Sequence, residues 1–416
     1  MALFVPDPEN PLSAADLIDD LGRVLAERYA NAEDELIREV AQRAYRDLQL
    51  QSKIRTADAA VKAGLRSALD RNRQLAELAG ERATALRDLQ FKAVQVVGRL
   101  RDEGLAEEII RVASEHGEAE AAARLGMASR LPATTTLNAT STSAATQLVL
   151  SLQSRLEELH MRITRYPRDA FQRIVAMTSP NVLLGASTQL RAQQQAVQMF
   201  LREGITGFVD KADRRWKIGS YAEMAGRTSV ARAFNDAGIA RMQSSDINLV
   251  TIVGSLSSCR RCAPWVGKIL STDGTTGTVT LPHATDVGDV SVDIFATLDA
   301  ARSGGLFHPN CSHRAVGYLP GLAIPQANFK YDEAADKARE RQREIEVEIR
   351  SAKRDQSVAA NDIEARKAAR RIKDRQQALS DHLEATGRKR ASYREQLHFA
   401  DGKGAPASAR PLALAS

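Results

Sequence analysis

From residue 259 the sequence reads CRRC, and from residue 308 it reads HPNCSH. These two stretches contain all three cysteines of the 416-residue chain. Two thiolates separated by two residues can reach one metal ion from a tight turn, and a later His/Cys pair can complete a tetrahedral shell. Sulfur and imidazole ligands together favour zinc. The two stretches therefore predict a structural zinc site, with candidate ligands Cys259, Cys262, His308, Cys311 and His313.

Tetrahedral zinc takes four ligands, so one histidine is expected to lie outside the shell. We favour His308 as the ligand, because its spacing to Cys311 repeats the two-residue gap of the first pair. Buried thiols without a metal are one alternative, and catalytic zinc or redox chemistry is another. A disulfide scheme leaves one of three cysteines unpaired, and no thioredoxin-like βαβ context surrounds the CRRC stretch.

The segment around these stretches, about 247–320, predicts a small β-rich unit. Strands are expected at 249–254, 278–281 and 290–295, set among several glycines. Large apolar residues are few there, and a core that modest often needs a metal, which can contribute on the order of 10 kcal/mol to folding.

The rest of the chain predicts helices. Residues 13–130 are rich in good helix formers with apolar residues at helical spacing, and Gly104 and Gly117 are expected to end helices. A turn is expected at 178–181. The other expected helices include 65–86, 89–101, 145–166, 167–177, 187–202, 221–244 and a charged segment at 331–397.

Part of the charged segment resembles a coiled-coil seam. Its apolar or small residues follow a 4-3-4-3-4 spacing, at Ala365, Ala369, Ile372, Gln376, Leu379 and Leu383. Gly387 is expected to end that helix. The fold class that follows is mainly α with a small β-rich zinc-stapled module (α+β), an extended multi-helical N-terminal half and charged C-terminal helices.

Changes in composition predict six regions along the chain. They are a helical N-terminal region at 1–131, a polar linker or hinge at 132–146, a helical region at 147–203, a core with the Cys/His module at 204–324, a charged helical, coiled-coil-like region at 325–403 and a disordered tail at 404–416.

The composition excludes some classes of protein. The N-terminus is acidic and broken by proline, unlike a signal peptide, and no apolar run approaches the length of a membrane span. We therefore expect synthesis in the cytoplasm and no membrane partner. The net charge of +6 favours contact with polyanions, although spread over the chain it is weak support for a nucleic-acid site.

Several motifs together resemble those of one known family. They are Tyr221-Ala-Glu-Met-Ala-Gly-Arg-Thr228, Leu249-Val250, Cys259-Arg-Arg-Cys-Ala-Pro-Trp-Val-Gly-Lys268, Gly305-Leu-Phe-His-Pro-Asn-Cys-Ser-His-Arg314 and the charged segment from Tyr331. In order and spacing the sequence resembles the minor capsid protein 2 family of tailed bacteriophages, relatives of the Mu F-type head morphogenesis proteins.

The resemblance implies a structural virion protein that acts in head morphogenesis at the portal vertex or capsid interior. It implies portal or capsid proteins, and possibly further copies of itself, as partners, and assembly in the host cytoplasm. A small-molecule substrate is not expected.

A basic run in the charged segment is a weak candidate for contact with packaged DNA. It comprises Arg366, Lys367, Arg370, Arg371 and Lys373. Acidic residues interleave with it, and mixed charge on a helix is more typical of a solvated face. A DNA-contacting or ejected virion protein is therefore an alternative function.

The sequence predicts no enzyme. The zinc-deaminase and metalloprotease patterns are absent, as is a phosphate-binding loop. A metal-dependent nuclease using His308, Asn310 or His313 is the enzymatic alternative. It would need a second acidic ligand group, for which Asp286, Asp289 and Asp293 are available.

Overall fold

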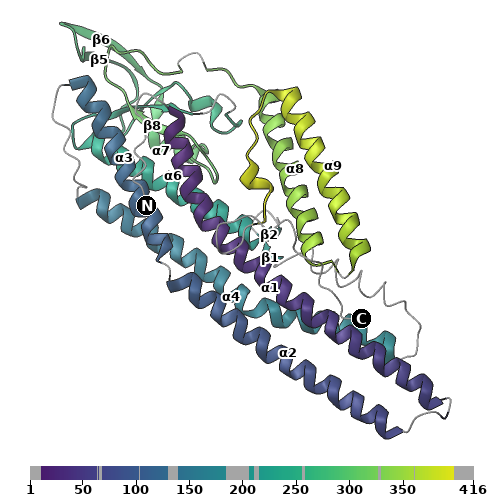
Figure 1. Cartoon of the computed structure of the whole chain (residues 1–416). Helices are drawn as coiled ribbons and strands as arrows, with labels where there is room; N and C mark the ends of the chain where they lie inside the picture. The colour runs from purple at the N-terminus through teal and green to yellow at the C-terminus, as the bar shows by residue number, and fades with distance from the viewer. Residues whose placement is uncertain are drawn as a thin grey trace. The chain divides into compact units, whose positions relative to one another are not determined.

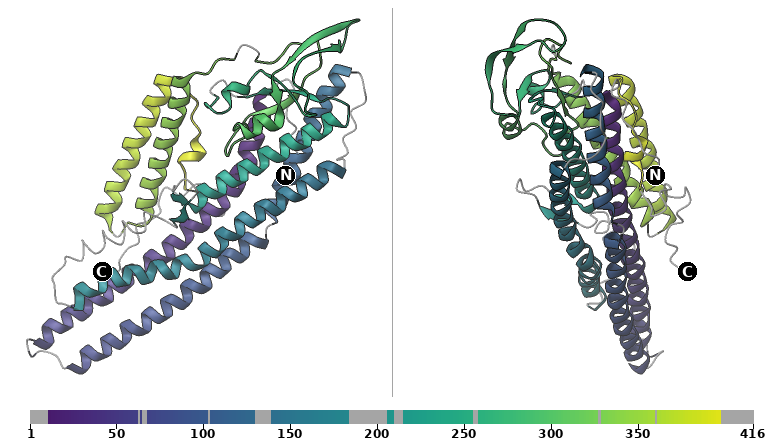
Figure 2. Two further views of the ribbon diagram at one scale, coloured as in Figure 1. Left: turned by 180° about the vertical axis from the view of Figure 1, so that it is seen from behind. Right: turned by 90° about the vertical axis from the view of Figure 1, so that its left-hand side faces the viewer.

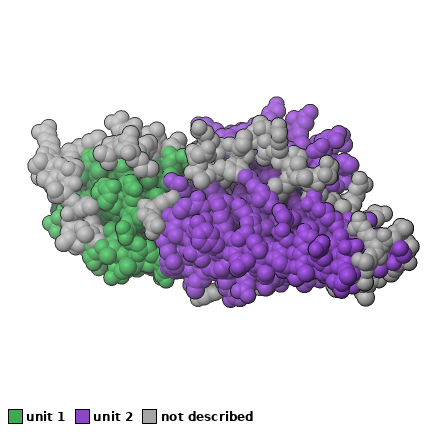
Figure 3. All heavy atoms as spheres, turned by 60° about the horizontal axis from the view of Figure 1, so that its bottom comes forward, with its two compact units in different colours: residues 1–26, 104–156, 222–340 green, residues 27–103, 157–221, 341–416 purple. Residues whose placement is uncertain are grey.

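The structure, a computed structural model, describes residues 11–62, 64, 68–102, 104–129, 139–183, 206–209, 215–254, 258–326, 329–359 and 361–397 (Figure 1). The chain divides into two compact units, each assembled from separate stretches (Figure 3). Unit 1 comprises residues 1–26, 104–156 and 222–340, and unit 2 comprises residues 27–103, 157–221 and 341–416. The six regions expected from composition stay a prediction.

Helices dominate the described chain, and the sheets are small, so a mainly α fold with a small β-rich module is confirmed (Figure 2). The helices are α1 (Pro11–Lys62), α2 (Ala68–Asp102), α3 (Leu105–Ser129), α4 (Ala139–Leu183), α6 (Ile218–Gln243), α7 (Leu298–Ser303), α8 (Glu333–Ser357) and α9 (Asp362–Thr386). The strands are β1 (Thr206–Val209), β2 (Arg215–Lys217), β3 (Leu249–Val253), β4 (Ile269–Ser271), β5 (Gly277–Pro282), β6 (Asp289–Ile294), β7 (Ala296–Thr297) and β8 (Arg314–Gly317).

The apolar core of unit 2 lies among α1, α2 and α4. Tyr45, Leu89 and Phe171 are each almost fully buried in one cluster with Val358, which follows α8. The Tyr45 hydroxyl donates to the Val358 carbonyl oxygen over 2.8 Å, so its one polar group is satisfied inside the core. This side chain therefore fixes the end of α8 on the helices of unit 2.

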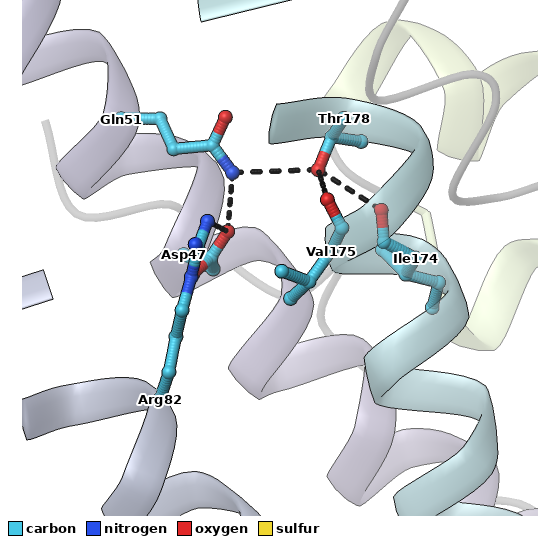
Figure 4. Close-up of polar contacts among 6 residues, drawn as sticks. All are labelled: Asp47, Gln51, Arg82, Ile174, Val175 and Thr178. Carbon is cyan, nitrogen blue, oxygen red and sulfur yellow. Dashed lines mark hydrogen bonds and ion pairs between the residues drawn. The ribbon is translucent and has the colours of Figure 1, made fainter. Parts of the chain in front are cut away.

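A buried polar network joins the same three helices (Figure 4). The Asp47 carboxylate of α1 accepts from Arg82 of α2, with Nε at 2.6 Å and Nη2 at 3.1 Å. Gln51 donates to Asp47 and, over 3.3 Å, to the Thr178 hydroxyl of α4. Thr178 in turn donates to the Ile174 carbonyl at 3.0 Å. Because each contact requires one relative position of the helices, the network fixes their register.

The helices α8 and α9 contribute their own cluster to unit 2. Ile345 and Ile349 of α8 pack with Leu379 of α9, and Leu383 lies against them. Two members of the expected seam are therefore core contacts. The charged segment is two helices, and Gly387 caps the second in the left-handed conformation with φ of 64°, as expected.

The β-rich part of unit 1 contains a four-stranded sheet and a two-stranded ribbon. The sheet order is β7-β4-β3-β8, with β3 antiparallel to both neighbours, and β5 pairs with β6 in the ribbon. The three expected strands are confirmed as β3, β5 and β6. The shorter β4, β7 and β8 had too few residues to show an alternating pattern.

Gly117 does not end a helix, contrary to expectation. It lies inside α3, where a Cβ atom would come within 2.1 Å of the Phe234 carbonyl oxygen of α6. The glycine therefore permits close approach of two helix backbones, and its helix continues because packing outweighs a cost of about 1 kcal/mol.

The expected turn at 178–181 is also wrong. α4, which begins at Ala139, continues through these residues to Leu183. Thr, Ser and Asn each cost less than about 1 kcal/mol in a helix, whereas Pro180 costs about 3 kcal/mol in a helix interior. Packing of the turns around the buried Thr178 must therefore outweigh the cost of Pro180 for α4 to continue. The expected helix at 187–202 and the tail at 404–416 lie outside the described residues.

Candidate metal centre

The first Cys pair lies in a tight turn after β3. The amides of Cys262 and Ala263 both donate to the Cys259 carbonyl, over 3.1 and 3.0 Å, and a short 3-10 helix, Ala263–Trp265, follows. The Gly267 amide then donates to the Ile252 carbonyl at 2.9 Å. This bond returns the turn to the strand that precedes it.

The second Cys/His stretch leads directly into β8. The Cys311 amide donates to the His308 carbonyl at 2.9 Å, and Asn310 adopts a positive φ of 65°. β8 pairs with β3 so that Val253 lies opposite Arg314. The two stretches therefore meet at one end of a strand pair, which explains how residues far apart in sequence share a site.

The five candidate ligands cluster as two overlapping triads. One triad is Cys259, Cys262 and His308, the other is Cys262, Cys311 and His313, and the ligand atoms within each lie within 4.8 Å of one another. Cys262 belongs to both triads. The Cys262 and Cys311 sulfur atoms are 3.5 Å apart, and the Cys259 sulfur lies 2.9 Å from His308 Nε2.

Both histidines are held by a second polar contact. His308 Nδ1 lies 2.8 Å from the Pro309 carbonyl oxygen, so this nitrogen donates and Nε2 is the nitrogen that can bind a metal beside Cys259. His313 Nε2 lies 2.6 Å from the Ser258 hydroxyl, and its Nδ1 lies 3.3 Å from the Cys311 sulfur. Each imidazole therefore presents a nitrogen to a thiol, with its other nitrogen occupied.

The thiols share their protons unequally. Hydrogen bonding from Cys262 lowers the pKa of Cys259 and of Cys311, against the effect of burial. Its bonds to these two partners, with burial, raise the pKa of Cys262 itself. The bond to Cys259 raises the pKa of His308. Two thiolates thus gather around one thiol, an arrangement that favours a cation in place of the shared protons.

Gly254 brings His313 against the backbone of the preceding strand. A Cβ atom at this position would lie 2.3 Å from His313 Cδ2. His313 and Cys311 are buried, and Cys262 is completely so. Three of the five candidate ligands are therefore shielded from solvent, whereas Cys259 and His308 are half-buried.

A family model for phage minor capsid protein 2 matches residues 17–384. This chain belongs to the phage minor capsid protein 2 family. The match includes the N-terminal helices, which the sequence motifs did not reach. No curated protein and no solved structure matches the chain. The helices that the structure describes include none long and apolar enough to cross a membrane.

Two polar residues of α6, whose role the motifs did not reveal, support the Cys/His cluster. Asn235 of α6 accepts from the Ala315 amide at 2.8 Å and donates to the His313 carbonyl at 3.3 Å. Thr228 accepts from the Asn310 amide at 3.2 Å. The available signal was two polar residues on the otherwise apolar face of the expected helix, which is typical of side chains that bond to backbone.

Arginines beside the thiols in this minor capsid protein have separate surroundings. Arg260 and Arg261 are exposed, whereas Arg314 is buried and donates to Glu120 of α3 over 2.7 Å. Arg314 therefore neutralises a buried carboxylate and links β8 to α3. Trp265 packs against the apolar cluster that includes Cys262 and Cys311. Its ring meets Phe295 edge to face, with ring centroids 5.9 Å apart.

The basic run of the minor capsid protein lies along α9. Arg371 donates to Asp355 at 2.8 Å, Lys367 to Glu364 at 3.0 Å, and Arg366 to the Asp362 carbonyl at 3.3 Å. Arg370 and Lys373 are exposed. The structure thus places these five residues on one helix, where some are already engaged in ion pairs.

Proposed function

We propose that this protein is a structural component of a tailed-phage head that acts in head morphogenesis at the portal vertex or in the capsid interior. The observation that carries the proposal is the family match over residues 17–384, since it covers both units of the chain. Portal and capsid proteins are the proposed partners, and helices of this length offer them extended contact surfaces.

The position in the head can be tested on purified particles. When heads and tails are separated from disrupted virions, this protein should be found in the head fraction and not in the tail fraction. It should also be present in heads that lack DNA. Cross-linking of such heads followed by mass spectrometry should join it to the portal protein or the major capsid protein. Recovery with tails alone would contradict the proposal.

We further propose that the Cys/His cluster binds one structural zinc ion. Three thiols and two imidazoles, of which Cys259 and His308 are half-buried and the others buried, meet at one end of a strand pair and are the donor set that zinc prefers. Cys259, Cys262 and Cys311 would supply three ligands and His308 the fourth, with His313 held by Ser258. Bound zinc would cross-link the loop after β3 to the loop before β8.

The fourth ligand can be identified by two matched variants. His308→Ala should lower the zinc content or weaken zinc binding strongly, whereas His313→Ala should retain about one zinc per chain with a smaller loss of affinity, on the order of tenfold, as for a supporting residue. The reverse result would assign His313 to the shell. Zinc content is measured on protein purified without added metal.

Contact with packaged DNA is the second candidate function. Arg370 and Lys373 favour it, because they are exposed on the same helix three residues apart. Binding that weakens steeply with salt, and weakens further in Arg370→Gln/Lys373→Gln, would support contact through α9. Absence of binding at low salt would remove this candidate.

A metal-dependent nuclease has less support. Among the described residues, the groups that could hold a metal consist of cysteine and histidine, while Asp286, Asp289 and Asp293 belong to the β5–β6 ribbon or its loop. Cleavage of plasmid DNA with added magnesium or manganese, lost in His308→Ala and His313→Ala, would restore this alternative.

A further inference from the structure

The β5–β6 ribbon of unit 1 has an open edge. β5 pairs with β6 along its whole length, from Gly277 opposite Ile294 to Pro282 opposite Asp289. On its other side β5 has no strand partner among the residues that the structure describes. Figure 1 shows the ribbon extending beyond the four-stranded sheet of the same unit. Such an edge presents unpaired backbone donors and acceptors to another extended chain.

The devices that usually protect an edge strand are missing from β5. Its sequence is Gly-Thr-Val-Thr-Leu-Pro, with no charged residue and with proline only at the last position. Its register with β6 is continuous, without a bulge. Thr278 and Thr280 are exposed, whereas Val279 and Leu281 face the apolar cluster around Leu249. One face of β5 is therefore packed, and the other is exposed to solvent.

The ribbon and the segments that flank it are acidic in a chain whose net charge is +6. Residues 269–301 contain no lysine or arginine. They contain five exposed aspartates, Asp273, Asp286, Asp289, Asp293 and Asp299. Asp289 and Asp293 lie opposite Pro282 and Thr278, on the exposed face of the ribbon. A strand added to β5 would place alternate side chains over this same face.

We propose that the open edge of β5 accepts an extended, lysine- or arginine-bearing segment of another protein as a third strand of the ribbon. The backbone of β5 supplies the pairing, and Asp289 and Asp293 select positive side chains on the exposed face. The remaining side chains of the added segment would be apolar or β-branched, extending the row begun by Val279 and Leu281. This interface requires only the fold of unit 1, so it is independent of the proposed position in the head.

The probe for this interface is a short fluorescein-labelled peptide of alternating lysine and valine, titrated into the full chain. Binding is followed by fluorescence anisotropy, and hydrogen exchange measures protection of the β5 amides. We expect saturable binding with added protection at residues 277–282. A glutamate-valine peptide should bind at least about tenfold more weakly, because the face is acidic.

Two controls separate strand addition from simple charge attraction. The same lysine-valine peptide with alternate N-methylated amides keeps its charge but cannot pair along the edge, and it should lose binding. Asp289→Lys/Asp293→Lys should weaken binding of the unmodified peptide about tenfold or more. The matched variant Asp374→Lys/Asp381→Lys changes two exposed acids of α9 by the same charge and should leave the affinity within about twofold.

Three outcomes would overturn the proposal. Equal binding of the N-methylated peptide would show charge attraction without pairing, and equal binding to the two double variants would place the contact elsewhere. A dimer in light scattering that Asp289→Lys/Asp293→Lys dissociates would show that a second copy of this chain covers the edge. Unchanged far-ultraviolet circular dichroism in both double variants keeps the comparison valid.

Discussion

The Cys/His module of unit 1 and the helical core of unit 2 show two ways of holding secondary structure together. In the module, strands of two to six residues surround a largely buried group of thiols and imidazoles. In unit 2, α2 alone has 35 residues, and charged side chains buried between helices supplement the apolar contacts. Short strands bury little apolar surface, so the proposed zinc would supply much of the module's stability, whereas the helical core distributes its stability over many contacts.

Removal of metal should have the largest effect, and it should be confined to unit 1. Cys259→Ser or Cys311→Ser should lose the zinc and destabilise the module by several kcal/mol, since structural zinc contributes on the order of 10 kcal/mol in small domains. Hydrogen exchange at β3, β4 and β8 should accelerate, while exchange in the α1, α2 and α4 core of unit 2 should change little. The variant Ser271→Ala is the control: it removes a buried hydroxyl of β4 and leaves every candidate ligand in place.

Equal acceleration in both units would contradict this difference between them. If the wild-type protein contains no metal after purification and binds none on titration, the cysteines are buried thiols, and packing alone stabilises the module.

The corresponding test in unit 2 removes the buried ion pairs of Arg354. This buried arginine of α8 donates from Nε to Asp34 of α1 over 2.8 Å, and its Nη2 lies 3.6 Å from Glu33. Arg354→Ala would leave two buried carboxylates without their cation, at a cost of about 3–5 kcal/mol. Denaturant unfolding should show this loss with zinc content unchanged.

A triple variant provides the control for Arg354. Replacing the cluster together, as Arg354→Met/Glu33→Gln/Asp34→Asn, removes the buried charges along with their partner and should recover much of the stability. If the triple variant is as unstable as Arg354→Ala, the methylene groups of Arg354, rather than its charge, are responsible.

Substitution of Gly117 tests the packing of helices in unit 1 away from the Cys/His cluster. Gly117→Ala places a methyl group where only 2.1 Å separates it from the Phe234 carbonyl oxygen, so α3 and α6 must move apart. Overpacking of this kind costs about 1–3 kcal/mol. Gly98→Ala in α2, where no atom lies within 4 Å of the added methyl group, should instead be neutral or stabilising. Equal thermal stability of the two variants would contradict the close approach.

The features predicted correctly from the sequence are those with a local signal. The Cys and His residues carry their chemistry in their identity, and strands such as β5 show alternation within six residues. Gly117 was misread because a helix stop and a close helix contact require the same residue, and only tertiary structure distinguishes them. Arg354 and Asp34 gave no signal, because each is an ordinary charged residue on a helix until the fold buries the two together.

The smallest expected effect is at the start of α9, where the local signal and the structure agree. Asn361 accepts from the amides of Ile363 and Glu364, both over 3.1 Å, and so caps the helix that carries the basic run. Asn361→Ala should cost about 1 kcal/mol, whereas Asn361→Asp keeps the acceptor and adds a favourable charge at the helix N-terminus. Hydrogen exchange in the first turn of α9 should rise only in the alanine variant, with zinc content unchanged. If faster exchange in the alanine variant extends as far as Leu379, α9 folds only as a whole. The many contacts of unit 2 are then less independent of one another than its distributed packing implies.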